Sequence, residues 1–276
     1  MRQRGTYRDA VAALAKGDLA DGLERLDKFG CFVEVRKDDP YLMLCNDYLK
    51  TLNAGKTALI ISPTHREGEA VTREVREALK RTGKIGTQDH PFWALRNLYW
   101  TEAEKGDAGR YRPGLVVQFF QNATDVKNGE RFRIEGKDEN GTVHAVGAGG
   151  QTIALPLQQV TRFQVYEPYR LGLAAGDTVR ITQNGKTEEG KKLNNGALYQ
   201  VKRFTRDGNI ILNNGWVIGK EFSHVTHGYC TTSHASQGKT VDRVFIAQSA
   251  ESFLASSQEQ FYVSVSRGRE GVRIYT

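Results

Sequence analysis

The sequence has 276 residues, of which 39% are hydrophobic and 26% are charged, as in an ordinary soluble globular protein. This composition excludes a disordered chain, and the length is enough for two or three domains with sizeable cores. The 39 lysines and arginines exceed the 32 aspartates and glutamates by a net charge of +7, which favours a polyanionic partner such as nucleic acid.

Membrane and redox signals are weak in this chain. No apolar run approaches the roughly eighteen residues of a membrane span, and residues 1–5 lack the apolar segment of a signal peptide. We therefore expect no membrane association and a cytoplasmic location. Cys31, Cys45 and Cys230 are odd in number and widely scattered, so they are interpreted as small buried hydrophobes and not as disulfide partners or zinc ligands.

The first third of the chain alternates predicted helices and strands. Apolar spacing predicts helices over residues 6–16, 19–28, about 39–52 and a fourth ending near 82, with strands over 31–35 and 58–62. The last strand and helix form a βα unit, and open α/β sheets bind ligands in the loops that follow their strands. Residues 1–108 are therefore predicted as the first part of an α/β domain.

A GKT tripeptide at residues 55–57 resembles part of a phosphate loop but lacks its context. The first glycine of GxxxxGKT should stand at position 50, which is Lys50, and a phosphate loop follows a strand and opens a helix. Here the apolar strand comes afterwards, so Lys56 is assigned to a turn.

The stretch His90–Trp100 is rich in aromatic residues. Trp93, Tyr99 and Trp100 are candidates for stacking on bases, but aromatic residues at this density are more often part of a core, and we favour the core. Thr101 and Glu104 then have the spacing of a capping box, which predicts a short helix.

Short strands with Gly and Asn turns occupy the middle of the chain in two similar series. Gly114, Asn122 and Asn128-Gly129 align with Gly176, Asn184 and Asn195-Gly196. Strands of this length and spacing predict two small antiparallel barrels, over residues 109–172 and 173–226. The basic loop 185–192 is either a DNA contact or an ordinary solvated hairpin tip.

Residues 227–276 carry the pattern with the strongest functional signal. A strand at 229–231 runs into Thr232-Ser-His-Ala-Ser-Gln-Gly-Lys-Thr240, whose small, hydroxyl and Gly residues suit a backbone that approaches a phosphate closely. A later helix ends at Arg267 and Arg269 in Ser-Arg-Gly-Arg, where a rigid guanidinium suits charge stabilisation in phosphoryl transfer. The alternative is a buried strand and an amphipathic helix with two solvated arginines.

Residues 232–238 and 262–269 resemble motifs V and VI of superfamily 1 helicases of the RecD-like branch, and the most similar members we can name are the helicase regions of conjugative relaxases of the TrwC/TraI type. The resemblance implies an α/β fold, with a RecA-like parallel-sheet lobe (the second lobe, motifs IV–VI) and inserted SH3-like β-barrels. Residues 1–108 and 227–276 would form the lobe, and the second barrel would be the usual insertion before motif V. It also implies that the chain begins in mid-protein, after a first lobe and a relaxase domain.

The same resemblance assigns roles to individual residues. Arg267 would be the arginine finger that senses the γ-phosphate of ATP. Contacts to single-stranded DNA would come from Ser62, Thr64, His65, Thr232, His234 and Ser236. Nucleotide contacts would come from Arg2, Gln237, Gly238, Lys239, Thr240 and Arg269. For two of these the alternatives stay open: Thr64 as a simple helix cap beside an exposed His65, and Arg2 as a flexible terminal residue.

The sequence contains neither GxxxxGKT nor a convincing Asp-Glu pair for magnesium. ATP and Mg²⁺ would therefore be held mainly by the first lobe, and the chain alone is expected to be inactive as an ATPase. The predicted function is the C-terminal half of an ATP-dependent 5′–3′ DNA helicase of a conjugative relaxase. The alternative is a non-catalytic module that binds single-stranded DNA or protein.

Overall fold

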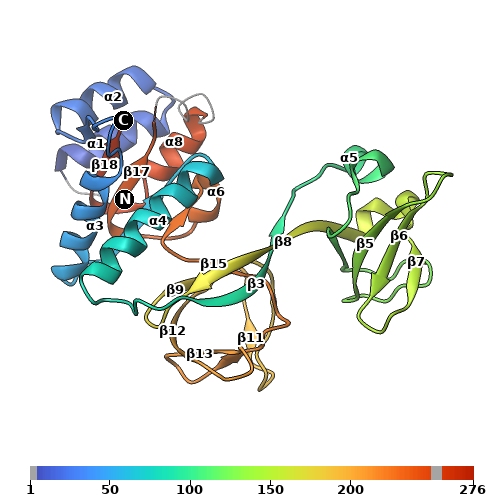
Figure 1. Cartoon of the computed structure of the whole chain (residues 1–276). Coiled ribbons are helices and arrows are strands. Elements are labelled where there is room, and N and C mark those ends of the chain that lie inside the picture. Colours follow the sequence, from blue (N-terminus) through green and yellow to red (C-terminus); the bar gives the residue numbers. More distant parts are fainter. Residues whose placement is uncertain (1–4, 250–256) are drawn as a thin grey trace.

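The computed structural model describes residues 5–249 and 257–276, so Arg2 lies outside the described residues. Figure 1 shows an α/β lobe and two β-sheet modules, which lie along a long ribbon formed by β3 and β8. We call the module next to the lobe the proximal β module and the other the distal β module. The predicted mixed α/β fold with a parallel sheet is confirmed.

A five-stranded parallel sheet forms the centre of the lobe, in the order β1-β18-β17-β2-β16. The strands are β1 (Phe32–Val33), β2 (Ala58–Ile61), β16 (Cys230–Thr231), β17 (Val241–Ala247) and β18 (Gly268–Tyr275). Segments from both ends of the chain therefore pair side by side. The C-terminal ends of β2 and β16 are neighbours, which brings the loops after them together.

Helices cover both faces of this sheet, because its strands are apolar on both sides. On β2, Leu59 and Ile61 pack into a core with α1 (Gly5–Ala15), α2 (Leu19–Lys28) and α8 (Gln258–Val265). Ile60 packs on the opposite face with α3 (Leu42–Asn53) and α4 (His65–Arg81). Each predicted helix is present. The three cysteines are free, with Cys31 and Cys45 buried and Cys230 half-buried.

The aromatic stretch forms β3 (His90–Asn97), which pairs antiparallel along its whole length with β8 (Phe163–Leu173). The aromatic residues of 90–100 are partly packed in cores and partly exposed. Phe92 is buried, and Trp100 packs against the distal core, but Trp93 and Tyr99 are 57% and 72% exposed. Thr101 caps α5 (Glu102–Gly106) with the predicted capping box.

The distal β module is an antiparallel sheet in the order β3-β8-β4-β5-β6-β7. Its further elements are the 3-10 turns Ala108–Arg110 and Leu157–Arg162 and the strands β4 (Val116–Phe119), β5 (Arg131–Lys137), β6 (Val143–Gly147) and β7 (Thr152–Ala154). The proximal β module has the order β14-β13-β12-β9-β15 and a separate hairpin β10-β11. These strands are β9 (Thr178–Ile181), β10 (Gly185–Lys186), β11 (Lys192–Leu193), β12 (Leu198–Phe204), β13 (Ile210–Leu212), β14 (Val217–Ile218) and β15 (Val225–His227).

Neither β module closes into a barrel by its strand pairing within the described residues. The edge strands of the proximal sheet, β14 and β15, do not pair with each other, nor do β3 and β7 in the distal sheet. The edge strands β7 and β14 have only three and two residues, which leaves little backbone for further pairing. The predicted SH3-like barrels are thus seen as open antiparallel sheets.

The internal repeat predicted from the sequence has a direct counterpart in hydrogen bonds. Asn122 Oδ1 accepts from the backbone N–H of Asn128 at 2.9 Å, and Asn184 Oδ1 accepts from that of Asn195 at 2.8 Å. Gly114 and Gly176 both have positive φ, 92° and 89°, where a side chain would be strained. The two modules therefore share one local design for their first strand and turn.

A buried polar network attaches the proximal β module to α4. The Arg76 guanidinium bonds Asp177, which is fully buried, at 2.8 Å and Asp89 at 2.6 Å. Tyr229 donates its hydroxyl to Asp177 as well, at 2.7 Å. Burial alone would lower the pKa of Arg76, but its hydrogen bonds to the two carboxylates raise it. The module is thus held against the lobe by a charge-paired contact.

Candidate nucleic-acid and nucleotide sites

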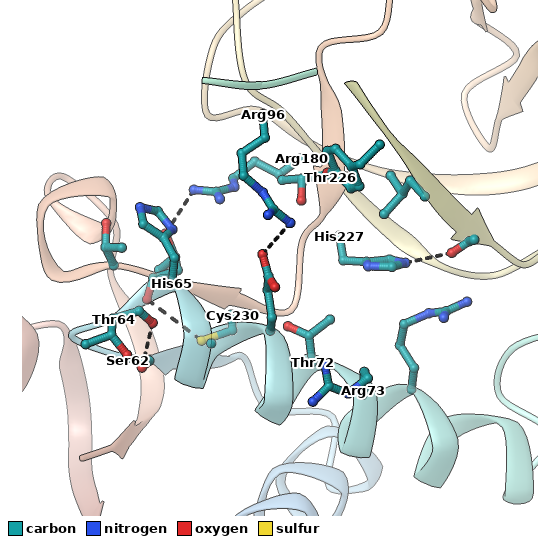
Figure 2. Close-up of a pocket in the computed structure, with 18 of the residues that line it drawn as sticks. Ser62, Thr64, His65, Thr72, Arg73, Arg96, Arg180, Thr226, His227 and Cys230 are labelled. Atoms are coloured by element: carbon teal, nitrogen blue, oxygen red, sulfur yellow. Dashed lines mark hydrogen bonds and ion pairs between the residues drawn. The ribbon is translucent and has the colours of Figure 1, made fainter. Parts of the chain in front are cut away.

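A cleft of about 410 Å³ separates the N-terminal half of α4 from the proximal β module. Its walls come from α4 and the loop before it, from β3 and β8, and from β9, β15 and β16. Figure 2 shows the side chains of both walls pointing into the space between them. The cleft therefore lies where the C-terminal ends of two lobe strands face the inserted module.

The cleft is lined by more positive than negative side chains. Five arginines line it, namely Arg73, Arg76, Arg96, Arg170 and Arg180, with two carboxylates, Glu69 and Asp89. Asp89 pairs with Arg76 and Glu69 pairs with Arg96, so the carboxylates are used within the protein. The cleft lining therefore keeps a net positive charge, which is the charge that suits a polyanion.

Two helices begin at the lobe side of the cleft, each with a threonine cap. The Thr64 hydroxyl accepts from the Glu67 N–H of α4 at 3.2 Å, and the Thr232 hydroxyl accepts from the Ala235 N–H of α6 (Ser233–Ser236) at 3.4 Å. His65 is exposed at the first turn of α4 and stacks on Tyr99, with ring centroids 6.2 Å apart. Helix N-termini and an exposed ring pair are features that suit a nucleic-acid strand.

The structure separates the six predicted DNA contacts into two groups. Thr64, His65 and Thr232 line the cleft, and His234 is exposed outside its lining. Ser62 also lines the cleft, but the residue is only 1% exposed. Its hydroxyl donates to the Thr64 carbonyl at 3.1 Å. Ser236 is fully buried and donates to the Ser233 carbonyl at 2.6 Å. Both serine hydroxyls thus serve the local fold.

The predicted nucleotide contacts lie around the turn that leads from α6 to β17. Gln237 and Gly238 are exposed, and Gly238 has a positive φ of 84°. Lys239 and Thr240 are half-buried, and Val241, which follows them, donates its N–H to the Arg267 carbonyl at 3.1 Å. The backbones of the two motifs are therefore adjacent, although 26 residues lie between Thr240 and Arg267 in the chain.

Arg267 stands at the C-terminal end of α8, as predicted. Its Nε donates to the Val263 carbonyl at 2.8 Å and its Nη2 to the Ser266 hydroxyl at 2.7 Å, so the guanidinium is folded back along its own helix. Arg269 is exposed and lies 3.7 Å from Asp242. Lys56 pairs with Glu270 at 2.5 Å in a turn, as expected for a residue outside a phosphate loop.

Several cleft residues escaped the sequence reasoning, chiefly Arg180, Arg96 and Tyr169. Alternation along β9 places Arg180 opposite the buried Val179 and Ile181, so its outward direction was predictable. What it faces depends on how the proximal β module docks on the lobe, and no local pattern carries that information. Among the described residues, no group of His, Cys, Asp or Glu side chains is arranged to hold a metal ion. No described helix is long and apolar enough to cross a membrane.

Comparison with known proteins gives partial matches. The model of the viral superfamily 1 RNA helicase core domain matches residues 158–276. Multifunctional conjugation protein TraI of Escherichia coli strain K12 is 23% identical over 171 residues, which is 60% of this chain and 9% of that protein. Conjugal transfer protein TraA of Agrobacterium fabrum is 43% identical over 54 residues, 20% of this chain and 4% of that protein. The chain thus spans a small share of these relatives.

Among solved structures, Pif1 helicase from Bacteroides in complex with ADP-AlF3 and ssDNA has a TM-score of 0.33 and 16% identity, over all of this chain and 50% of that one. Pif1 helicase from Candida albicans has a TM-score of 0.34 and 12% identity, over all of this chain and 55% of that one. The match to the helicase core domain and the similarity to TraI identify in this chain a region related to superfamily 1 helicases.

Proposed function

We propose that this chain is the second RecA-like lobe of a superfamily 1 DNA helicase that acts in conjugative DNA transfer. In this proposal single-stranded DNA lies in the cleft between α4 and the proximal β module, and the two inserted modules correspond to SH3-like domains. The observation that carries it is the arginine-lined cleft with its two capped helix N-termini, next to the segments that resemble motifs V and VI.

The DNA contacts of the proposal are the groups that reach the cleft. Thr64 and Thr232 mark helix ends whose free N–H groups suit phosphate oxygens, and His65 with Tyr99 offers ring faces for a base. Arg73 is exposed on α4 and lines the same wall. Nucleotide contacts are proposed for Gln237, Gly238, Lys239 and Thr240, with Arg269 in support.

Binding of labelled single-stranded DNA, followed by fluorescence anisotropy across a salt series, tests the first part. We expect the logarithm of affinity to fall with the logarithm of salt concentration by about 0.7 for each phosphate contacted. Arg73→Glu should weaken binding strongly, and Arg203→Glu, on an exposed part of β12 outside the cleft lining, should weaken it far less. Equal losses in both variants would mean that only net charge matters, and a salt-independent affinity would exclude phosphate contacts.

In this function a first lobe holds ATP, because this sequence has no GxxxxGKT. We propose that Arg267 leaves Val263 and Ser266 and turns toward the γ-phosphate when the two lobes close on ATP. In a polypeptide that joins this chain to its first lobe, Arg267→Ala should lower ATP turnover by roughly 10³-fold while leaving DNA binding intact. Unchanged turnover would remove the finger role.

A second candidate is a binding module without catalysis, derived from such a helicase. The absence of GxxxxGKT from these 276 residues favours it over an ATPase that acts alone. It predicts DNA or protein binding that is the same with and without ATP and a first lobe. DNA affinity measured with the joined polypeptide, in the presence and absence of a non-hydrolysable ATP analogue, separates the two candidates.

A further inference from the structure

Arg180 reaches the cleft from the proximal β module. Its neighbours in β9, Val179 and Ile181, are fully buried in the core of the module, so Arg180 extends from the other face of the strand. Figure 2 shows its side chain running toward the N-terminal end of α4, where His65 lies. One cationic side chain of the inserted module is thus placed beside the N-terminal end of α4.

The hydrogen bonding of Arg180 is incomplete. Its Nη1 donates to the Thr231 hydroxyl at 3.2 Å. Its Nε is buried and has no partner, and among all buried side-chain nitrogen and oxygen atoms of residues 5–249 and 257–276 this is true of Nε alone. A buried donor without an acceptor destabilises a fold, so such a group needs a reason to be kept.

The charge of Arg180 is also uncompensated. Arg76 and Arg96 in the same cleft pair with carboxylates, whereas Arg180 forms no ion pair within the described residues. Burial lowers the pKa of Arg180, and the neighbours that raise it are Cys230, Tyr99 and Tyr169, none of which is a carboxylate. The pKa of Lys239 is lowered as well, by burial and then by the charge of Arg180. Two positive charges therefore repel each other next to the cleft.

We propose that Arg180 is a phosphate ligand, whose Nε holds an oxygen of a phosphate group bound between the proximal β module and the lobe. The proposal deepens the proposed function, since the phosphate would then be a backbone phosphate of single-stranded DNA. The same chemistry fits a free phosphate group, for example that of a nucleotide. A phosphate at this place satisfies the Nε donor and neutralises the repulsion between Arg180 and Lys239.

A phosphate bound at Arg180 lies between the proximal β module and the lobe. Arg180 belongs to the module, while Thr231 ends β16 and Lys239 lies in the turn between α6 and β17, where nucleotide contacts are proposed. A phosphate bound there contacts both parts. The inserted module then takes part in DNA binding directly, and a shift of the turn on ATP binding changes the grip on that phosphate.

The test compares Arg180→Met with the unchanged chain in anisotropy titrations with a labelled oligo(dT) strand. Loss of a charge-assisted hydrogen bond should weaken binding about tenfold or more and should reduce the slope of affinity against salt by about 0.7. The melting temperature should stay the same or rise, because the substitution removes an unpartnered buried donor. Arg203→Met, which removes one exposed charge outside the cleft, should leave affinity within about twofold.

A structural role for Arg180 would give a different result. Arg76→Met, which strips a partner from the buried Asp177, should lower the melting temperature clearly. If Arg180→Met lowers it as much, the side chain is structural and the proposal is overturned. If the chain binds oligo(dT) and Arg180→Met binds it with the same affinity and salt slope, the proposal fails while the proposed function stands.

Inorganic phosphate and ATP, tested separately by thermal shift against matched chloride solutions, distinguish the two sources of phosphate. Stabilisation of the unchanged chain that is lost in Arg180→Met supports the site with a free phosphate as its ligand. Weakened oligo(dT) binding without any such stabilisation supports a DNA backbone phosphate. A chain that binds neither oligo(dT) nor phosphate overturns both the site and the proposed function.

Discussion

Three arginines lie where parts of the molecule meet, and their guanidinium groups differ in the hydrogen-bond partners that replace water. Arg76 is compensated by two carboxylates. Arg131, from the distal β module, donates to the backbone carbonyls of Glu221 and Phe222 at 2.7 and 3.0 Å. Arg180 has one hydroxyl partner and one unpaired donor. Arg76 and Arg131 thus join parts of the molecule through their hydrogen bonds, whereas the Nε of Arg180 has no partner among the described residues.

His224 is the residue through which acid should act on the junction between the two β modules. It is 2% exposed, its Nε2 lies 2.7 Å from Gln118 Oε1, and Tyr166, Phe222 and Arg131 surround it. Burial, helped by the charge of Arg131, lowers the pKa of His224 from 6.5 to about 3. The folded protein therefore keeps this imidazole neutral where the unfolded chain takes up a proton.

The free energy of unfolding should fall as the pH is lowered from about 6.5, by about 1.4 kcal/mol per pH unit for this group. Its stabilising effect is complete above pH 6.5 and is lost toward pH 3. Burial also lowers the pKa of His227, which acts in the same direction. This dependence can be measured by urea unfolding between pH 4.5 and 7.5. The free energy of unfolding of His224→Gln should fall less steeply with falling pH than that of the unchanged protein, by the equivalent of one proton. Curves of the free energy of unfolding against pH that run parallel for His224→Gln and the unchanged protein would contradict this assignment.

At the scale of elements, local signals predicted the parts and failed on their assembly. The α4 helix with its Thr64 cap, the capping box of α5 and the paired Asn turns were predictable, because each depends on residues close in sequence. The strand β3 was missed, since its hydrophobic pattern makes sense only beside β8. The core of the proximal β module likewise takes in Phe92 and Leu171 from outside 173–226.

One part of the candidate site was predictable from the sequence and the other part was not. The motif segments at 232–240 and 267–269 lie together because β17 and β18 are paired neighbours in the parallel sheet. The opposite wall of the cleft, with Arg180 and Tyr169, comes from a separate module. Its contribution is set by buried contacts between distant residues, such as Arg76 with Asp177, and these leave no periodic pattern in the sequence.

Helix α8 leads into the turn that contains Arg267, and it is held in place by α1. The hydroxyl of Tyr7, which is 1% exposed, donates to the carbonyl of Val265 in the last turn of α8. Tyr7→Phe would leave this carbonyl buried and unpaired, at a cost of about 1–3 kcal/mol in the free energy of unfolding. In Tyr7→Phe we also expect the amides of α8 to exchange hydrogen faster than in the unchanged protein, while the amides of α4 keep their exchange rates. The control is Tyr262→Phe, whose hydroxyl has no hydrogen-bond partner among the described residues; an equal cost in both variants would contradict the anchoring role.

On the scale of the whole molecule, the cores are separate. The two cores of the lobe flank its sheet, and the proximal and distal β modules each have a core of their own with no buried residue in common. The contacts that join the two modules beside the ribbon are polar, as with Arg131 and His224. Polar junctions of this kind hold geometry but add little apolar burial, so cooperative unfolding of the entire chain is not expected.

The distal β module should therefore unfold in its own transition, and Trp100 can report it. The sequence has three tryptophans, and Trp100 packs in the distal core with its ring 5.3 Å from that of Tyr111. With Trp93→Phe and Trp216→Phe together, all tryptophan fluorescence comes from Trp100. Its urea midpoint should differ from that of far-ultraviolet circular dichroism, which the lobe helices dominate. Arg131→Met in this background should widen the difference, because it removes the bonds to Glu221 and Phe222. Coincident transitions in both proteins would instead mean that the junction couples the modules into one cooperative unit.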